Sequence, residues 1–240
     1  MDIQLHYVEK GQGMPLILLH GNGEDGGYFK HQIDHFSGAY RVIAIDTRGH
    51  GQSPRGFAPF TIRQFAEDLY NFMEEKKIEK AHILGFSDGG NIAMVFAMEY
   101  PQKVEKLILN GANLCGSGVK PLVQIPIILG YRLACFFERF SAKADAKAQM
   151  LGLMVNDPAL RPEELKKIKA RTLVIAGTRD MIKEKHTKLI FASLTDAKLV
   201  LIPGNHFIAA RQPEEFNREV ELFLEEKPEH LYGAEGRKEK

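Results

Sequence analysis

The sequence predicts an α/β fold with a mostly parallel central sheet, helices on both faces and a small helical insertion. Short apolar runs typical of buried strands alternate with segments of helical spacing in residues 1–111 and again from residue 169, and this alternation indicates crossover connections between parallel strands. Between residues 112 and 168 the strand pattern stops. We therefore expect a core domain formed by residues 1–111 and 169–226, a helical cap at 112–168 and a mobile charged tail at 227–240.

The composition argues against several classes of protein. The chain has 240 residues, 44% of them hydrophobic, and a formal net charge of +1, which argues against attraction of the whole chain to nucleic acid or to an anionic membrane. The apolar stretch near residues 125–133 is interrupted by Pro126, Gly130 and Arg132, and it is shorter than the roughly 20 residues that cross a bilayer. We expect neither a nucleic-acid partner nor a membrane span.

The N-terminus and the cysteines favour a cytoplasmic location. The first residues, Met1–Gln4, lack the basic region and apolar run of a secretory signal. The two cysteines, Cys115 and Cys135, provide no disulfide framework. We expect both to be packing residues, because no nearby arrangement of histidine suggests a catalytic thiol.

The first part of the chain contains three predicted strands. Residues Ile3–Glu9 alternate between apolar and polar side chains, which predicts a half-exposed strand. Continuous apolar runs at Pro15–His20 and Arg41–Asp46 predict strands buried on both faces. The glycine loop His20–Gly23 follows the first of these runs and precedes a helix expected from about Tyr28 to Phe36. Its glycines permit backbone amides to point into a cavity.

The polar loop at residues 46–54 has two interpretations. It contains Asp46, Arg48 and His50, and such a dense polar loop after a parallel strand could be catalytic. We favour a structural role, in which Asp46 and Arg48 brace the loop through charge-assisted hydrogen bonds. The segment Thr61–Lys77 then has helical spacing, with Thr61 as its cap.

A serine-centred turn follows the next predicted strand. The run Lys80–Leu84 leads into Gly85-Phe86-Ser87-Asp88-Gly89 and then into a helix from Asn91 to Tyr100. A strand that turns sharply into a helix strains the backbone of the central serine, so the flanking glycines have a steric reason. Ser87 would then stand exposed above the sheet edge. A lone match to this pattern also fits a turn serine at a helix start.

The remaining segments follow the same logic. Val104–Asn110 predicts a further strand. The cap has aromatic and aliphatic residues at helical spacing, including Ile128, Tyr131, Leu133, Phe136, Phe137 and Phe140. We expect most of the aromatics to pack against the body and only some to line a substrate cavity. The closing elements are predicted as strand Arg171–Ala176, helix Glu184–Leu194, strand Lys198–Ile202 and helix Pro213–Glu225.

Three predicted strand ends supply the groups of a nucleophilic site. Parallel strands present their carboxyl ends at one sheet edge, where ligands bind. A serine hydroxyl is a weak nucleophile until a base removes its proton, and an acid must hold that base in one tautomer. We assign Ser87 as nucleophile, His206 as base and Asp180 as acid. The backbone amides of Asn22 and Asp88 are the expected donors to a developing oxyanion.

Competing residues fit these roles less well. His206 lies in a glycine-led loop after the last strand, whereas His82 opens a strand and other histidines lie on predicted helices: His31, His35 and His186. The alternative position for the acid follows the strand that ends near Asn110, where no carboxylate occurs. Asp180 is therefore preferred.

Five motifs occur in a fixed order along the chain. They are His20-Gly21-Asn22-Gly23, Asp46 to Ser53, Gly85 to Gly90, Gly177-Thr178-Arg179-Asp180 and Gly204-Asn205-His206. Together they resemble the α/β-hydrolase superfamily over about residues 3–224. The resemblance implies an α/β-hydrolase fold and a serine hydrolase that works through an acyl-enzyme, without metal or cofactor, on a small-molecule acyl substrate whose binding site is shaped by the cap. The serine separates the chain from branches with an aspartate nucleophile, and the absence of tryptophan makes members with a cap tryptophan poor guides.

The specificity stays open at this point. The Ser-Asp-Gly-Gly elbow is similar to that of valacyclovir hydrolase-like proteins, so Asp88 either attracts a substrate amine or is an acidic residue placed favourably in the first turn of a helix. The leading function is hydrolysis of small carboxylic esters or related acyl compounds. Alternatives are hydrolysis of a carbon–carbon bond in a dioxo acid, and a ligand-sensing protein that keeps the triad. The oligomeric state and the cellular substrate do not follow from the chain pattern.

Overall fold

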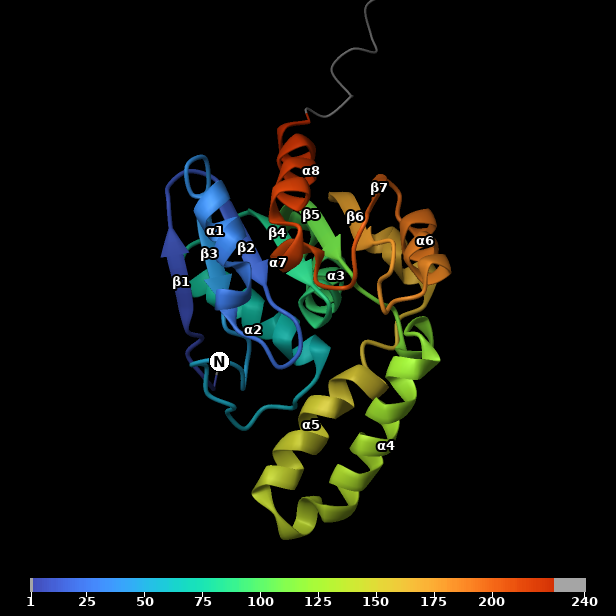
Figure 1. The fold of residues 1–240 in the computed structure, drawn as a ribbon. Coiled ribbons are helices and arrows are strands. Elements are labelled where there is room, and N and C mark those ends of the chain that lie inside the picture. Colours follow the sequence, from blue (N-terminus) through green and yellow to red (C-terminus); the bar gives the residue numbers. More distant parts are fainter. Residues whose placement is uncertain (1, 227–240) are drawn as a thin grey trace, which may run out of the picture.

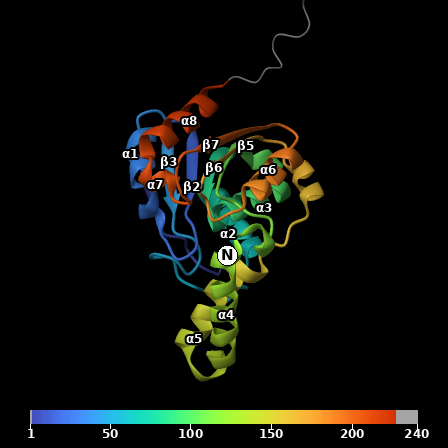
Figure 2. The same ribbon diagram turned by 45° about the vertical axis from the view of Figure 1, so that its right-hand side comes forward.

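The computed structural model describes residues 2–226, so the predicted tail at 227–240 lies outside the described residues. A seven-stranded sheet in the order β1-β3-β2-β4-β5-β6-β7 forms the middle layer, and helices cover both of its faces (Figures 1 and 2). The strands are β1 (Tyr7–Lys10), β2 (Pro15–Leu19), β3 (Arg41–Ile45), β4 (Ala81–Phe86), β5 (Val104–Asn110), β6 (Arg171–Gly177) and β7 (Ala197–Ile202). The predicted α/β-hydrolase fold is confirmed.

The direction of the strands determines where a site can form. Only β1 is antiparallel, pairing Tyr7 with Ile45 of β3. The pairs from β3 through β7 are all parallel. Their carboxyl ends therefore meet at one edge of the sheet, where the loops after β2, β4, β6 and β7 come together.

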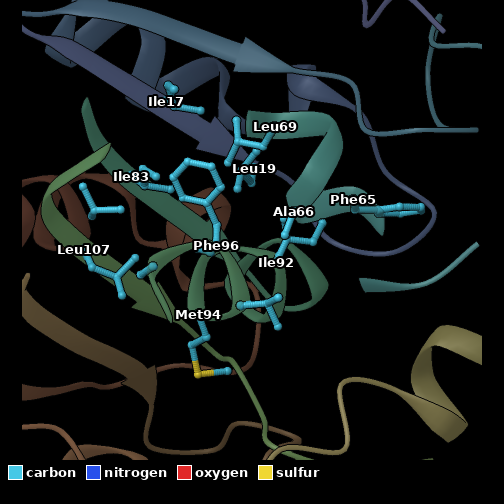
Figure 3. Packing of buried hydrophobic residues seen from close by; sticks show 14 of the residues in the cluster. Ile17, Leu19, Phe65, Ala66, Leu69, Ile83, Ile92, Met94, Phe96 and Leu107 are labelled. Atoms are coloured by element: carbon cyan, nitrogen blue, oxygen red, sulfur yellow. The ribbon is translucent and has the colours of Figure 1, made fainter. Parts of the chain in front are cut away.

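Two hydrophobic clusters lie on opposite faces of the sheet. Along β2, Ile17 and Leu19 belong to one cluster while Leu16 and Leu18 belong to the other, as the alternation of a strand requires. Figure 3 shows the first cluster, in which the side chain of Phe96 lies among residues of the sheet and of a neighbouring helix. Helices α2 (Ile62–Glu75), α3 (Asp88–Glu99) and α6 (Glu184–Ser193) contribute to this face, and α1 (Lys30–Phe36), α7 (Ile208–Arg211) and α8 (Pro213–Glu225) to the other.

The largest differences from the predicted elements are at β1, α3 and α7. Strand β1 begins at Tyr7 instead of Ile3, because pairing with β3 starts there; Ile3 and Leu5 are buried without joining the ladder. Helix α3 begins at Asp88, three residues before the predicted start, since tight packing of the elbow overrides the low helix propensity of its glycines. The short helix α7 was not predicted, because four residues give no periodic pattern.

A helical hairpin projects from the body between β5 and β6 (Figure 1). It consists of α4 (Pro121–Phe137), a 3₁₀ turn at Glu138–Phe140 and α5 (Ala142–Asn156), and further 3₁₀ turns lie at Gly116–Gly118 and Pro162–Lys167. The expectation that most aromatics of this insertion pack against the body is wrong. The outward residues of the hairpin are 45% to 67% exposed: Leu133, Phe136, Phe137 and Phe140.

Helix α4 also corrects the prediction about long apolar segments. Residues Pro121–Phe140 are long and apolar enough to cross a membrane by length and composition alone, and 11% of an 18-residue apolar segment within them is buried. We expected Pro126 and Gly130 to interrupt the segment. The helix instead continues through both, because its packing against α5 holds it together across them.

Candidate active site

The turn after β4 holds Ser87 in a strained conformation. Ser87 has φ 53° and ψ −119°, and helix α3 begins at the next residue. The turn is possible because the residues on both sides of Ser87 include glycines, which have no Cβ. A Cβ on Gly85 would lie 2.2 Å from the carbonyl oxygen of Gly89, and a Cβ on Gly89 would lie 2.0 Å from the carbonyl oxygen of Leu19. Both glycines are therefore required by close approach of backbone, and the turn presents the partly exposed Ser87 side chain at the sheet edge.

The structure brings Ser87, His206 and Asp180 together from three loops. The Nε2 atom of His206 lies 3.0 Å from the Oγ atom of Ser87, and its Nδ1 atom lies 2.7 Å from Oδ1 of Asp180. His206 and Asp180 are each 3% exposed. The same Asp180 oxygen accepts the amide hydrogen of Ile182 at 2.8 Å, which fixes the carboxylate. A carboxylate on Nδ1 selects the tautomer whose free Nε2 can accept the serine proton.

The two predicted oxyanion residues are also neighbours. The Nδ2 atom of Asn22 donates to Oδ2 of Asp88 at 2.9 Å. Asp88 is the first residue of α3, so its backbone amide has no acceptor within the helix. The close approach of Gly89 to the carbonyls of Leu19 and His20 brings the glycine loop directly against the elbow.

His20 holds this glycine loop, a role that sequence reasoning missed. Its Nδ1 atom lies 2.8 Å from the carbonyl oxygen of Gly21, and its Nε2 atom accepts the amide hydrogen of Thr47 at 3.0 Å. These partners require the neutral ring with the proton on Nδ1. Burial lowers the pKa of His20 to about 4, which keeps that state. The available signal was a polar residue at the end of a strand buried on both faces.

The carboxylate of Asp88 is buried and shared between two amides. Besides Asn22, the Nδ2 atom of Asn91 donates to its other oxygen at 3.2 Å. Asp88 is 7% exposed, and burial raises its pKa. Asn22 uses its second amide hydrogen on the carbonyl oxygen of Met150 in α5, at 2.9 Å. Asn22 therefore connects the glycine loop, the elbow and the hairpin.

Aromatic groups pack beside His206, and a second acidic residue contacts the glycine loop after β2. The ring of Phe86 lies 4.8 Å from that of His206, between ring centroids, and Tyr28 stacks on Phe86 at 4.4 Å. Glu24 accepts the amide hydrogen of Gly21 at 3.3 Å, and burial raises its pKa. Sequence reasoning did not identify Glu24 or Tyr28, since neither belongs to a motif.

The loop at residues 46–54 has the bracing contacts that we expected of it. Oxygens of the Asp46 carboxylate accept the amide hydrogens of Gly26 at 2.8 Å and Gln52 at 2.9 Å. The Arg48 guanidinium is buried and donates to both carboxylate oxygens of Asp68 at 2.7 Å. These contacts fix the loop as part of the scaffold.

Cys115 and Cys135 are free and partly buried, and the Sγ atom of Cys115 lies 3.0 Å from the Oγ atom of Ser117. Among residues 2–226, the structure contains no group of three or more histidine, cysteine, aspartate or glutamate side chains that could hold a metal ion.

The chain is similar to known proteins over nearly its whole length. Residues 14–148 match the family described as alpha/beta hydrolase fold. Serine hydrolase BPHL of Homo sapiens is 28% identical over 93% of this chain and 84% of the relative. The 2-hydroxy-6-oxononadienedioate/2-hydroxy-6-oxononatrienedioate hydrolase of Comamonas testosteroni is 28% identical over 93% of this chain and 92% of the relative. A solved structure, a hydrolase from Pseudomonas aeruginosa PA01, has a TM-score of 0.77 and 26% identity, covering 93% of this chain and 95% of that one.

Proposed function

The chain belongs to the alpha/beta hydrolase fold family, and on that premise we propose that it is a serine hydrolase that cleaves small carboxylic esters or related acyl compounds through an acyl-enzyme. The observation on which this proposal rests is the continuous set of contacts from Asp180 through His206 to Ser87. A relative named as a serine hydrolase supports the same chemistry.

The geometry suits a two-step acyl transfer. His206 Nε2 takes the hydroxyl proton while Ser87 Oγ attacks the ester carbonyl, and it then gives that proton to the departing alkoxide. In the second step a water molecule attacks the acyl-enzyme while His206 Nε2 takes its proton. His206 then gives that proton to Ser87 Oγ as the bond from Oγ to the acyl carbon breaks, and the carboxylic acid leaves. Asp180 stabilises the imidazolium that forms each time, and it remains ionised.

The backbone amides of Asn22 and Asp88 are our proposed oxyanion donors. The tetrahedral intermediate places negative charge on the former carbonyl oxygen, and each positioned donor lowers the barrier by roughly 3 kcal/mol. The contact between the Asn22 and Asp88 side chains fixes the separation of the two backbone segments. We therefore propose that the Asp88 carboxylate positions Asn22. The competing role of Asp88 is the selection of a substrate amine. In that role the Asp88 carboxylate must release one of its two amide donors, Asn22 or Asn91.

Hydrolysis of a carbon–carbon bond in a dioxo acid is the second candidate function. The observation that favours it is the relative from Comamonas testosteroni, whose name specifies a 2-hydroxy-6-oxo diacid as substrate. The same nucleophile, base and oxyanion donors serve that reaction in principle, with a carbon leaving group in place of an alkoxide.

A substrate panel separates the two candidates. Purified protein is assayed with activated esters, thioesters, amides and a ring-cleavage-type dioxo acid, in each case beside Ser87→Ala. Ester or thioester turnover that Ser87→Ala lacks supports the leading proposal. Turnover of the dioxo acid alone would transfer the assignment to the second candidate, and equal rates for both proteins would refute the serine mechanism.

A further inference from the structure

One side of helix α4 is apolar along its whole length and lies in solvent. Six large residues on this side are between 55% and 92% exposed. They are spaced by three or four positions, so the five on α4 fall on one side of a helix with 3.6 residues per turn, and the sixth lies in the 3₁₀ turn that follows. We call this surface the α4 apolar face, defined as Leu122, Ile125, Leu129, Leu133, Phe136 and Phe140.

The hairpin does not need this face to hold itself together. The opposite side of α4 packs on α5, where Gln124 and Ala134 are buried. Gln124 donates to the carbonyl oxygen of Met154 at 3.1 Å, and Asn156 donates to the Tyr131 hydroxyl at 3.1 Å. Within the part of the chain that the structure describes, nothing covers the α4 apolar face. Contiguous exposed apolar surfaces of this kind indicate an interaction site, whereas a single exposed residue such as Phe57 does not.

The charge of the hairpin indicates the partner. Residues 121–156 contain four basic and two acidic side chains, so the hairpin has a net charge of +2 while the whole chain has +1. Four exposed basic side chains lie in the half of the hairpin near its tip: Arg132, Arg139, Lys143 and Lys147. Arg132 is three positions from Leu129 and four from Phe136, so it borders the apolar face. The Arg139 guanidinium lies over the Phe140 ring at 4.6 Å from its centroid. Apolar residues bordered by lysine and arginine are typical of helices that lie in the interface of an anionic bilayer.

We propose that the α4 apolar face docks on an anionic lipid surface. The helix lies in the plane of the interface, its leucines and phenylalanines enter the acyl boundary, and the basic side chains contact acidic headgroups. The face spans about 27 Å, from a rise of about 1.5 Å per residue between Leu122 and Phe140. The net charge of the whole chain does not indicate this attraction to an anionic surface, because the excess of positive charge is confined to the hairpin.

Two other occupants fit the observations less well. A membrane span would expose the polar contacts between α4 and α5 to lipid, since Gln124 and Tyr131 have their partners on α5. A second copy of the chain would bring two hairpins of net charge +2 against each other, and like charges at an interface oppose association. An anionic bilayer is complementary to both the charge and the apolar residues.

Vesicle flotation with the full chain tests the proposal. Phosphatidylcholine vesicles are used with and without about one third phosphatidylglycerol. The protein is expected to float with the anionic vesicles, more weakly at high salt, and poorly with the neutral ones. Phe136→Glu should weaken binding at least about tenfold, and replacing Arg139 and Lys143 by glutamine should weaken it to a similar extent on anionic vesicles only. Phe57→Glu is the matched control, because it makes the same change at a 99% exposed phenylalanine outside the hairpin, and it should bind normally.

The absence of tryptophan from the chain allows a second readout. Phe136→Trp introduces a single fluorophore on the α4 apolar face, and its emission should shift to shorter wavelength with anionic vesicles, while that of Phe57→Trp should not. Equal binding to neutral vesicles, no binding at all, or a Phe57→Glu defect equal to that of Phe136→Glu would overturn the proposal. Dimerisation that Phe136→Glu abolishes, without vesicle binding by the unaltered protein, would assign the face to a second copy instead. Ser87→Ala should bind vesicles normally, so this test is independent of the proposed hydrolase chemistry.

Discussion

The side-chain amide of Asn22 donates to the carboxylate of Asp88 at 2.9 Å, and this contact links the glycine loop after β2 to the elbow after β4. The two loops are 66 residues apart in the chain. Both backbone amides proposed as oxyanion donors belong to these two residues. The contact therefore links the buried Asp88 carboxylate to the positions of the two backbone amides that we propose as donors to the oxyanion.

Replacing Asp88 should lower the rate constant more than it weakens substrate binding. Asp88→Ala leaves the amides of Asn22 and Asn91 without their acceptor, and displacement of an oxyanion donor costs about 10²-fold or more in kcat. Steady-state kinetics on an activated ester should show kcat falling with little change in KM. Matched amino and des-amino esters provide the control. A loss confined to the amino ester would show instead that Asp88 selects an amine.

Replacing Ser87 by glycine should stabilise the protein while it removes activity. The φ of 53° at this position is strained for any residue with a Cβ and is not strained for glycine. Ser87→Gly is expected to unfold at a higher urea concentration than Ser87→Ala. Its free energy of unfolding should be larger by about 1 kcal/mol, after allowance for the greater freedom of glycine in the unfolded chain. Equal stability of these two inactive variants would contradict the idea that the elbow stores strain.

The elbow should not tolerate a methyl group at Gly89. A Cβ there would lie 2.0 Å from the carbonyl oxygen of Leu19, so backbone must move. Gly89→Ala is expected to lower the free energy of unfolding by several kcal/mol and to abolish ester turnover. The matched control is Gly38→Ala, whose Cβ would meet nothing within 4 Å. Thermal unfolding of both variants checks this, and similar midpoints would be inconsistent with a close approach of the two loops in the folded protein.

Acid should destabilise the protein through two buried histidines. Burial lowers the pKa of His20 and of His82 to about 4, from an ordinary value of 6.5. Between these two pKa values the unfolded chain therefore binds more protons than the folded protein. The contribution of the two neutral histidines to the free energy of unfolding is complete above pH 6.5 and is lost as the pH falls toward 4. Each group should cost on the order of 1 to 2 kcal/mol at pH 5. Urea unfolding at pH 7 and pH 5 measures the loss, which His82→Phe should reduce; an unchanged loss would exclude His82.

Much of the sheet could be predicted from the sequence, because buried parallel strands require continuous apolar runs. Strand β5 has the predicted bounds, Val104–Asn110. The residues at the strand ends were predictable for a similar reason: once the strands are parallel, Ser87, Asp180 and His206 must lie on one edge. What the pattern could not indicate was contact between loops, such as that of His20 with Thr47.

The cap shows where hydrophobic pattern is an insufficient guide. An apolar residue at helical spacing is equally consistent with packing against the body and with an exposed face, since the pattern contains no information about which surface receives it. Phe136 and Phe140 were expected to pack and are 63% and 67% exposed. Tyr131, on the other side of the same helix, does have a partner on α5.

The nucleophile can be tested most directly by labelling with a fluorophosphonate probe, which reacts covalently with activated serines. The unaltered protein should gain the mass of a single probe, located on the peptide that contains Ser87, and His206→Ala should react far more slowly because the hydroxyl has lost its base. Ser87→Ala should not be labelled. Labelling of Ser87→Ala at full strength, or modification at any other residue, would contradict the assignment of Ser87 as the nucleophile.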